Sequence, residues 1–317
     1  MYNGLVRKPD HCEIYGVTVC PHLGKKYHYG NKYKGKFISH EKAALLKKFL
    51  RNQVPSLLYD QSVKGFDPTK WSVCIHSTEN ARLYLVPYHG YGNAYSNLVH
   101  VHRSKNEDEN DFLYHTTSNL INERNPVRIT DGWNGVGIMV GIGEHLSRDG
   151  QHTDFVVRPK FRTIWNNAEE KRTMSECGDI FEAQFKNKFV GYKEMIGHQK
   201  LLWPNNCPSR VTDVPRCWNA SKNLGNELHN DCDADRSFAV WINKNKGEIS
   251  KSWYLLFPEW DVAIELCNGT WISWNGKSCG HCTAVPDLDV GDELLALFCS
   301  IPMNLHKHLL RKKNMMV

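Results

Sequence analysis

Residues 237–299 contain a series of short apolar segments separated by turn signals, and this pattern limits the possible folds more than any other feature. Asn268-Gly269 and Asn275-Gly276 are dipeptides typical of tight turns that follow a strand. The predicted strands are residues 237–242, 253–257, 262–267, 270–274 and 293–299. Short strands at this spacing predict a sandwich or a barrel.

A His-x-Asp sequence stands just before these strands, and another histidine follows the fourth of them. Residues two apart on a strand project to the same face, so His229 and Asp231 can converge on one point. His281, from a neighbouring strand, would complete a set of two histidines and one carboxylate. Such a set holds Fe(II) and leaves positions open for O2 and a co-substrate. The pattern predicts an oxygen-activating iron enzyme with its metal at the open end of the strands.

The same region resembles a known family. The matching segments are residues 225–231, 236–239, 253–258, 272–276 and 281–283. They are similar to the TET/JBP-type iron dioxygenases, and most of all to the algal branch that modifies 5-methylcytosine with ascorbate as co-substrate. The resemblance covers roughly residues 125 to 300 and is sharpest between 225 and 299.

The resemblance implies an α+β protein whose core is a double-stranded β-helix (jelly roll) with flanking helices. It implies Fe(II) on His229, Asp231 and His281, which are both the metal ligands and the catalytic residues. The implied substrate is 5-methylcytosine in DNA, with L-ascorbate and O2 as co-substrates and a glyceryl adduct as product. A duplex base must flip out, or be single-stranded, to reach a buried iron.

The residues after His281 bear on the choice of co-substrate. Enzymes that use 2-oxoglutarate usually place an Arg or Lys about ten to thirteen residues after the distal histidine, where it pairs with the far carboxylate. Here Gly291, Asp292, Glu293 and Leu294 fill that region, and no Lys or Arg occurs before Lys307. An acidic pair would repel a dicarboxylate, whereas ascorbate has no far carboxylate, so we expect ascorbate. A cation from elsewhere, such as Arg236 or Lys277, is the alternative, and it would make the protein a 2-oxoglutarate-dependent hydroxylase.

Further residues are predicted to serve ligands around the iron. Arg236, Ser237 and Thr283 are predicted to bind the co-substrate, and Trp241 and Trp253 to line a base pocket, with Trp271 and Trp274 as further candidates for stacking. Core packing is the expected role for at least two of these four tryptophans. A different class of function also stays open, namely a module that binds methylated DNA without turnover, although such a module has no need of three metal ligands.

Two other motifs offer competing sites. His152-Thr153-Asp154, with His198 and Arg210, mimics the spacing of a 2-oxoglutarate enzyme, but residues 167–199 read as a helix with Phe181, Phe185 and Phe189 on one face. The tetrapeptide 279–282 (Cys-Gly-His-Cys) matches a redox motif, yet too little chain follows it for a thioredoxin fold. Packing thiols that flank an iron ligand are the expected role. The glycine-rich segment 135–143 lacks dinucleotide-binding spacing and is expected to be a tightly packed strand.

Composition sets wider bounds. The chain has 317 residues, a net charge of +6 and 11 scattered cysteines, and no apolar stretch long enough for a membrane span. We expect a soluble, intracellular and nuclear protein with reduced thiols that has no membrane partner. Residues 1–119 are expected to form an N-terminal extension and 120–317 the dioxygenase domain; 107–111 is expected to be a solvated acidic loop.

The extension contains cations interleaved with aromatic residues between positions 25 and 37. Cations neutralise phosphates and aromatic rings stack on bases, so the segment is either a nucleic-acid contact or a solvated hairpin. The predicted nucleic-acid-binding residues are Lys25, Lys26, Lys32, Lys34 and Lys36.

Overall fold

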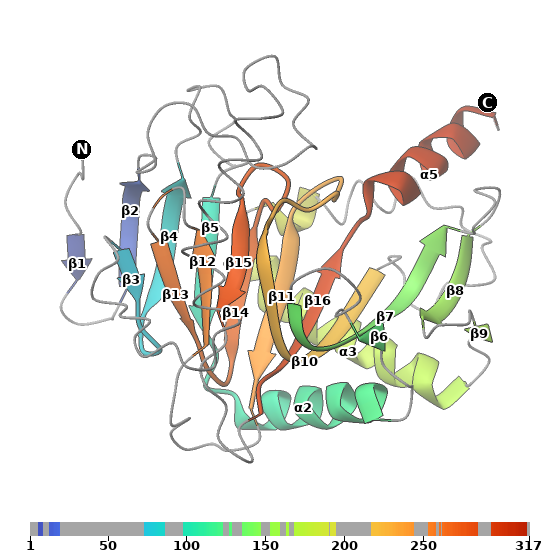
Figure 1. Ribbon diagram of the computed structural model, residues 1–317, viewed down its shortest axis with the longest axis horizontal. Helices are drawn as coiled ribbons and strands as arrows, with labels where there is room; N and C mark the ends of the chain where they lie inside the picture. Colours follow the sequence, from blue (N-terminus) through green and yellow to red (C-terminus); the bar gives the residue numbers. More distant parts are fainter. Residues whose placement is uncertain are drawn as a thin grey trace.

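The protein was analysed as a computed structural model of all 317 residues (Figure 1). The residues that the structure describes are 6–8, 13–19, 73–85, 98–122, 127–128, 135–146, 153–158, 163–164, 168–189, 191–194, 217–243, 253–257, 260, 262–284 and 293–315. Lys25, Lys26, Lys32, Lys34 and Lys36 lie outside these ranges, so their predicted role stays a prediction.

The described residues form a mixed, sheet-rich fold with few helices. The strands before residue 200 are β1 (Val6–Lys8), β2 (Glu13–Val19), β3 (Val73–Ile75), β4 (Asn80–Leu85), β5 (Leu98–Arg103), β6 (Val127–Arg128), β7 (Gly135–Leu146), β8 (Thr153–Arg158) and β9 (Thr163–Ile164). The later strands are β10 (Cys217–His229), β11 (Ser237–Ile242), β12 (Trp253–Phe257), β13 (Val262–Leu266), β14 (Thr270–Trp274), β15 (His281–Ala284) and β16 (Leu295–Ser300). The helices are α2 (Glu107–Asn122), α3 (Ala168–Lys188) and α5 (Met303–Met315).

All five strands predicted from the turn pattern are present. Three match their predicted bounds, β13 ends one residue early, and β16 starts two residues late and ends one residue late. The glycine-rich segment is part of β7, which confirms a strand there. The helix predicted over 167–199 is present as α3, which begins one residue later and ends at Lys188.

The later strands connect in the order β14-β11-β16-β10-β15-β12-β13. The first half of β10 pairs with β16, from Cys217↔Ser300 to Lys222↔Leu295. After Asn223, a non-glycine residue with φ of 50°, the second half pairs with β15 instead. β10 therefore joins two groups of antiparallel strands, β14-β11-β16 on one side and β15-β12-β13 on the other.

Successive side chains along the strands point to opposite faces, and the two faces belong to two separate cores. One, the helix-side core, contains Phe238, Val240 and Trp271 and packs against Phe181 and Phe185 of α3 and against residues of α2. Figure 1 shows α3 crossing behind the strands and α2 running below them. The other, the inner core, is formed by the opposite strand faces; it contains Trp241, Trp274, Trp253, Leu255, Phe257, Ala239, Ala296 and Phe298.

The acidic segment 107–111 is helical, so the prediction of a solvated loop was wrong. These residues form the first turn of α2, where Asn106 Oδ1 accepts the Glu109 N–H at 3.3 Å. Acidic side chains are favourable at a helix N-terminus because they face the positive end of its dipole. Buried Leu113 and Ile121 further along anchor the helix, and periodicity over 107–111 alone could not reveal them.

The described residues before position 120 share one sheet with those after it. β5 pairs with β14, β3 pairs in parallel with β13, and α2 runs through residue 119. The division at residue 119 stays a prediction. Among the described helices, none is long and apolar enough to cross a membrane.

Candidate metal centre

The two predicted histidine ligands lie opposite each other on paired strands. His229 is the last residue of β10, His281 is the first residue of β15, and the two are Cα partners in the antiparallel register. The register shifts between Asn226 and His229, so the strand is irregular just before the site. Asp231 follows two residues after His229, and its N–H donates to the Gly276 carbonyl at 2.9 Å.

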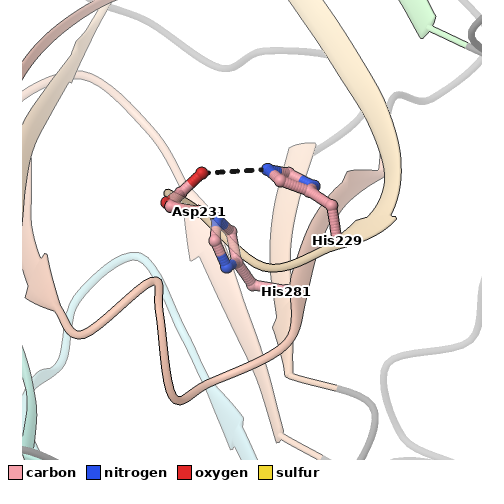
Figure 2. Close-up of side chains that lie close together, drawn as sticks. All are labelled: His229, Asp231 and His281. Atoms are coloured by element: carbon pink, nitrogen blue, oxygen red, sulfur yellow. Dashed lines mark ion pairs between the residues drawn. The ribbon is translucent and has the colours of Figure 1, made fainter. Parts of the chain in front are cut away.

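The three side chains converge on one point (Figure 2). Asp231 Oδ1 lies 3.4 Å from His229 Nε2, and Asp231 Oδ2 lies 3.4 Å from His281 Nε2. One ligand atom from each residue lies within 4.8 Å of the others, and this is the one group of its kind found among the described residues. The structure therefore brings together all three residues predicted from the sequence.

The hydrogen bonding of His281 makes this group fit a metal ion. His281 Nδ1 lies 3.0 Å from the Cys279 carbonyl oxygen, which can only accept, so Nδ1 carries the proton. In the neutral ring, Nε2 then presents a lone pair toward Asp231 Oδ2, which is also an acceptor. Two facing acceptors repel unless a proton or a metal cation lies between them, and metal-bound histidines usually have this carbonyl-held arrangement.

Burial differs among the ligands. The His281 side chain is 5% exposed, whereas those of His229 and Asp231 are 33% and 25% exposed. The His281 ring also packs edge-on against Trp274, with centroids 5.4 Å apart, and lies 6.2 Å from the Phe257 ring. The group thus sits at the margin of the inner core, with one ligand held firmly and the other two reachable from solvent.

The predicted co-substrate residues lie in different environments. Thr283 is the Cα partner of Leu255, an inner-core residue, and Ser237 shares its strand face with Ala239 and Trp241. Ser237 Oγ donates to Asp233 Oδ2 at 2.9 Å. Both positions face the same side as His281, and their role in binding stays a prediction.

Arg236 instead bonds to Ser273 and Leu98 on neighbouring strands. Its Nε donates to Ser273 Oγ at 2.9 Å, and its Nη2 donates to the carbonyls of Ser273, at 3.0 Å, and of Leu98. The residue is 4% exposed, and burial lowers the pKa of its guanidinium to about 10. These bonds connect β5 and β14 to the start of β11. Arg236 therefore has a role in holding the strands together that its place in the sequence did not indicate.

The tryptophans proposed for a base pocket are buried. Trp241 and Trp253 are 3% and 0% exposed and belong to the inner core, whereas Trp271 belongs to the helix-side core. Trp241 packs against Phe298, with ring centroids 5.5 Å apart. Trp274, a further candidate for stacking, is in ring contact with His281, one of the predicted ligands.

Glu293 does not face the interior of the strands. Its carboxylate pairs with Lys222 of β10 and accepts a hydrogen bond from the Tyr114 hydroxyl of α2. The inward positions on this part of the chain are Leu294, Ala296 and Phe298. The premise that Glu293 would repel a dicarboxylate is therefore wrong, because the carboxylate is turned toward α2 and neutralised; Asp292 lies outside the described residues.

The competing motifs do not form a second site among the described residues. His152 and His198 lie outside the described ranges, and Asp154 is the backbone partner of His145 within the β7–β8 pair. Cys279 and Cys282 are buried thiols outside any disulfide, and burial raises the pKa of Cys282 well above its usual range. A buried, protonated thiol is unreactive, as expected for a packing residue.

Sequence reasoning missed the part played by the turn at 275–279. Gly276 contacts Asp231 and the Cys279 carbonyl accepts from His281, both through main-chain atoms. The Asn-Gly dipeptide signalled a turn, but no residue type in it suggested a contact with a metal ligand.

The sequence matches no protein-family model and no curated protein. Among solved structures, NgTET1 in complex with 5mC DNA aligns with a TM-score of 0.46 and 10% identity, covering 85% of this chain and 99% of that one. A Pseudomonas putida prolyl-4-hydroxylase aligns with a TM-score of 0.39 and 9% identity over 64% and 91% of the two chains. A viral collagen prolyl hydroxylase from Paramecium Bursaria Chlorella virus-1 aligns with a TM-score of 0.34 and 10% identity over 64% and 94%. These values describe a likeness in the arrangement of strands, and the function proposed below rests on the residues of the site.

Proposed function

We propose that this protein is an Fe(II)-dependent dioxygenase that modifies 5-methylcytosine in DNA with L-ascorbate as co-substrate. The observation that carries the oxygenase assignment is the convergence of His229, Asp231 and His281 with an imidazole lone pair facing a carboxylate oxygen. Two histidines and one carboxylate with open positions are the ligand set of non-haem Fe(II) oxygenases. The choice of base and of co-substrate rests on the sequence motifs around these ligands.

The strand order supports a double-stranded β-helix as the framework. β14-β11-β16 with the first half of β10 forms one group, and β13-β12-β15 with the second half of β10 forms the other. Their inner faces enclose the inner core, at whose margin the ligands lie. This arrangement gives an oxygenase a shielded interior beside its metal and an exposed side for a large substrate.

An iron bound here would supply activation of O2 and chelation of the co-substrate. His281, anchored by the Cys279 carbonyl and packed by Trp274, would hold it from the buried side. His229 and Asp231 would hold it from the exposed side, where a flipped base can approach. Trp274 and Phe257 lie against the His281 ring and would limit the access of water from that side.

The choice of ascorbate is supported by the inward face of β16 and the residue before it. Leu294, Ala296 and Phe298 offer no cation where 2-oxoglutarate enzymes place one. A dicarboxylate buried there would have an unpaired charge, which is costly. Ascorbate needs only hydrogen-bond partners at its tail, and Ser237 and Thr283 are the predicted ones.

The decisive test is a reaction with methylated duplex DNA, Fe(II), O2 and either ascorbate or 2-oxoglutarate, followed by mass spectrometry of the nucleosides. We expect a glyceryl adduct of 5-methylcytosine with ascorbate and little product with 2-oxoglutarate. A hydroxymethyl product that requires 2-oxoglutarate, with stoichiometric succinate, would replace this proposal by that of a TET-like hydroxylase. Tight binding to methylated DNA without iron uptake or product would identify a binding module.

Contact with DNA by the N-terminal lysines is part of the proposal, and so is action in the nucleus. If Lys25, Lys26, Lys32, Lys34 and Lys36 touch duplex phosphates, replacing them by Gln should reduce the log–log salt slope of binding by about 0.9 per lost contact. If the salt slope of the variant equals that of the unmodified protein, these lysines do not contact DNA and the segment is a solvated hairpin. Nuclear action is tested separately by imaging the tagged chain in its own cells.

A further inference from the structure

We infer that the 275–279 turn between β14 and β15 sets the iron affinity of this protein, with Gly276 as a positioning residue for the Asp231 carboxylate. The inference rests on the proposed metal site and goes beyond it, because it assigns control of the site to a segment that contributes no ligand.

Gly276 lies against the carboxylate of Asp231. A Cβ atom at position 276 would lie 2.0 Å from Asp231 Oδ2, 2.8 Å from its Cγ and 2.9 Å from its Cβ. Contacts this short do not occur, so a side chain at 276 must displace the Asp231 side chain or the turn itself. Among the described glycines, positive φ values are found at Gly191 and Gly269, not at Gly276. Glycine is therefore needed at 276 for space rather than for backbone conformation.

The displaced atom would be the one that faces His281. Asp231 Oδ2 is the oxygen that lies 3.4 Å from His281 Nε2. Moving it opens the gap in which the metal would be bound, while His229 and His281 stay where their strands place them. Gly276 thus sets the distance between the carboxylate and the buried histidine.

Main-chain carbonyls of the same turn also bond to Asp231, to its neighbour Asn230 and to His281. The Gly276 carbonyl accepts the Asp231 N–H at 2.9 Å, and the Lys277 carbonyl accepts from Asn230 Nδ2 at 3.3 Å. The Cys279 carbonyl lies 3.0 Å from His281 Nδ1. The segment that follows β10 and the start of β15 are therefore both bonded to the same turn, residues 275–279.

Asn275 stabilises the shape of the turn. Its Oδ1 accepts the N–H groups of Lys277, at 3.1 Å, and Ser278, at 3.2 Å, and its carbonyl accepts the Cys279 N–H at 2.9 Å. Trp274, which immediately precedes it, is buried against His281. A turn held at both ends in this way places its carbonyls at defined positions, which is what an outer shell of a metal site requires.

The test measures Fe(II) binding by anaerobic equilibrium dialysis and Co(II) binding by visible absorption, on the full chain. Gly276→Ala should weaken Fe(II) binding roughly 10–100-fold, the usual range for loss of an outer-shell partner, and change the Co(II) spectrum. Asn275→Ala should weaken it in the same direction by a smaller factor. The control is Gly269→Ala, in the preceding hairpin, where φ is +73° and a Cβ would lie 2.2 Å from the Ser104 carbonyl oxygen. That variant should melt at a lower temperature but bind Fe(II) as the unmodified chain does once folded.

A double-mutant cycle separates positioning from general damage. Asp231→Gly removes every Asp231 atom that a Cβ at 276 would meet. Gly276→Ala should therefore lower the thermal midpoint of the unmodified chain and have little effect in the Asp231→Gly background. Equal losses in both backgrounds would overturn the inference.

The binding outcomes distinguish this inference from the proposed function. Suppose that Gly276→Ala binds Fe(II) within twofold of the unmodified chain while His229→Ala loses Fe(II) binding. That result overturns the role of the turn and leaves the metal site intact. If Gly276→Ala fails to fold, unchanged affinity and Co(II) spectrum in Asn275→Ala have the same meaning. An unmodified chain that binds no Fe(II) overturns the proposed function, and the inference with it.

Discussion

Two carboxylates stand near the ends of the paired strands β10 and β16, Asp231 after β10 and Glu293 before β16. Their surroundings are opposite in character. Glu293 is matched by a lysine, Lys222, and by the donating hydroxyl of Tyr114. Burial and the neighbouring carboxylate raise the pKa of Tyr114 to about 12, so the phenol stays a donor at neutral pH. Asp231 instead faces imidazole nitrogens on two sides.

The difference shows how a structural carboxylate differs from one placed to bind a cation. The charge on Glu293 is already balanced by protein groups. At Asp231, the neutral form of His281 adds a lone pair instead of a proton, because its other nitrogen donates to a carbonyl. A cation placed between these acceptors would stabilise the set.

The largest expected effect is at the ligands themselves. His229→Ala, Asp231→Ala and His281→Ala should each abolish iron-dependent turnover and weaken Fe(II) binding beyond the roughly 10–100-fold loss seen for outer-shell changes. Circular dichroism should show that each variant remains folded. Glu293→Gln is the matched carboxylate control and should retain turnover; full activity in any ligand variant would remove the contrast between the two carboxylates.

Substitution of Arg236 tests whether this cation stabilises the fold or binds the co-substrate. Its guanidinium serves main-chain carbonyls of Leu98 and Ser273, so Arg236→Met should lower the free energy of unfolding by roughly 2–4 kcal/mol through unpaired buried acceptors. Chemical denaturation measures this loss. If Arg236 binds the co-substrate, as spacing suggested, the variant would raise the KM for ascorbate and leave stability unchanged.

A histidine away from the metal centre predicts the response to acid. Burial lowers the pKa of His100 to about 3, helped by the positive charges of Arg82 and Arg236. His100 is therefore neutral in the folded state, while its unfolded value is near 6.5. Below pH 6.5 the unfolded state binds more protons, so stability should fall as the pH drops toward 4, by up to about 1.4 kcal/mol per pH unit.

Urea titrations of metal-free protein between pH 7.5 and 4.5 measure this slope. His100→Gln keeps an acceptor for the Arg82 Nε–H and cannot titrate, so its slope should be shallower. Identical slopes would assign the acid sensitivity to other groups, the metal-ligand histidines among them.

The smallest effect is expected at Glu293. Glu293→Gln keeps an oxygen for the Tyr114 hydroxyl and loses the ion pair with Lys222, whose side chain is 34% exposed, so stability should fall by about 1 kcal/mol or less. The preference for ascorbate over 2-oxoglutarate should not change, because Glu293 points toward α2. A gain of activity with 2-oxoglutarate would restore the earlier interpretation of this residue.

The strands and the ligands could be predicted because each depends on local signals. Continuous apolar runs located β11, β12 and β14 to the residue, with Asn-Gly turns on either side of β14, and the His-x-Asp spacing indicated two candidate ligands at one strand end. The helix at α2 was missed because its acidic first turn resembles a loop until the packing of Leu113 and Ile121 is known.

The sequence by itself determined which residue types are available, namely three side chains that can bind a metal, a set of short buried strands and no Lys or Arg between His281 and Lys307. Only the tertiary structure decided which way each side chain faces: Glu293 toward Lys222 and Tyr114, Arg236 toward Leu98 and Ser273, and Gly276 against Asp231. The physical reason is that a strand alternates its faces at every residue, so register and pairing with distant strands fix the surroundings of a side chain, and neither is encoded in local spacing.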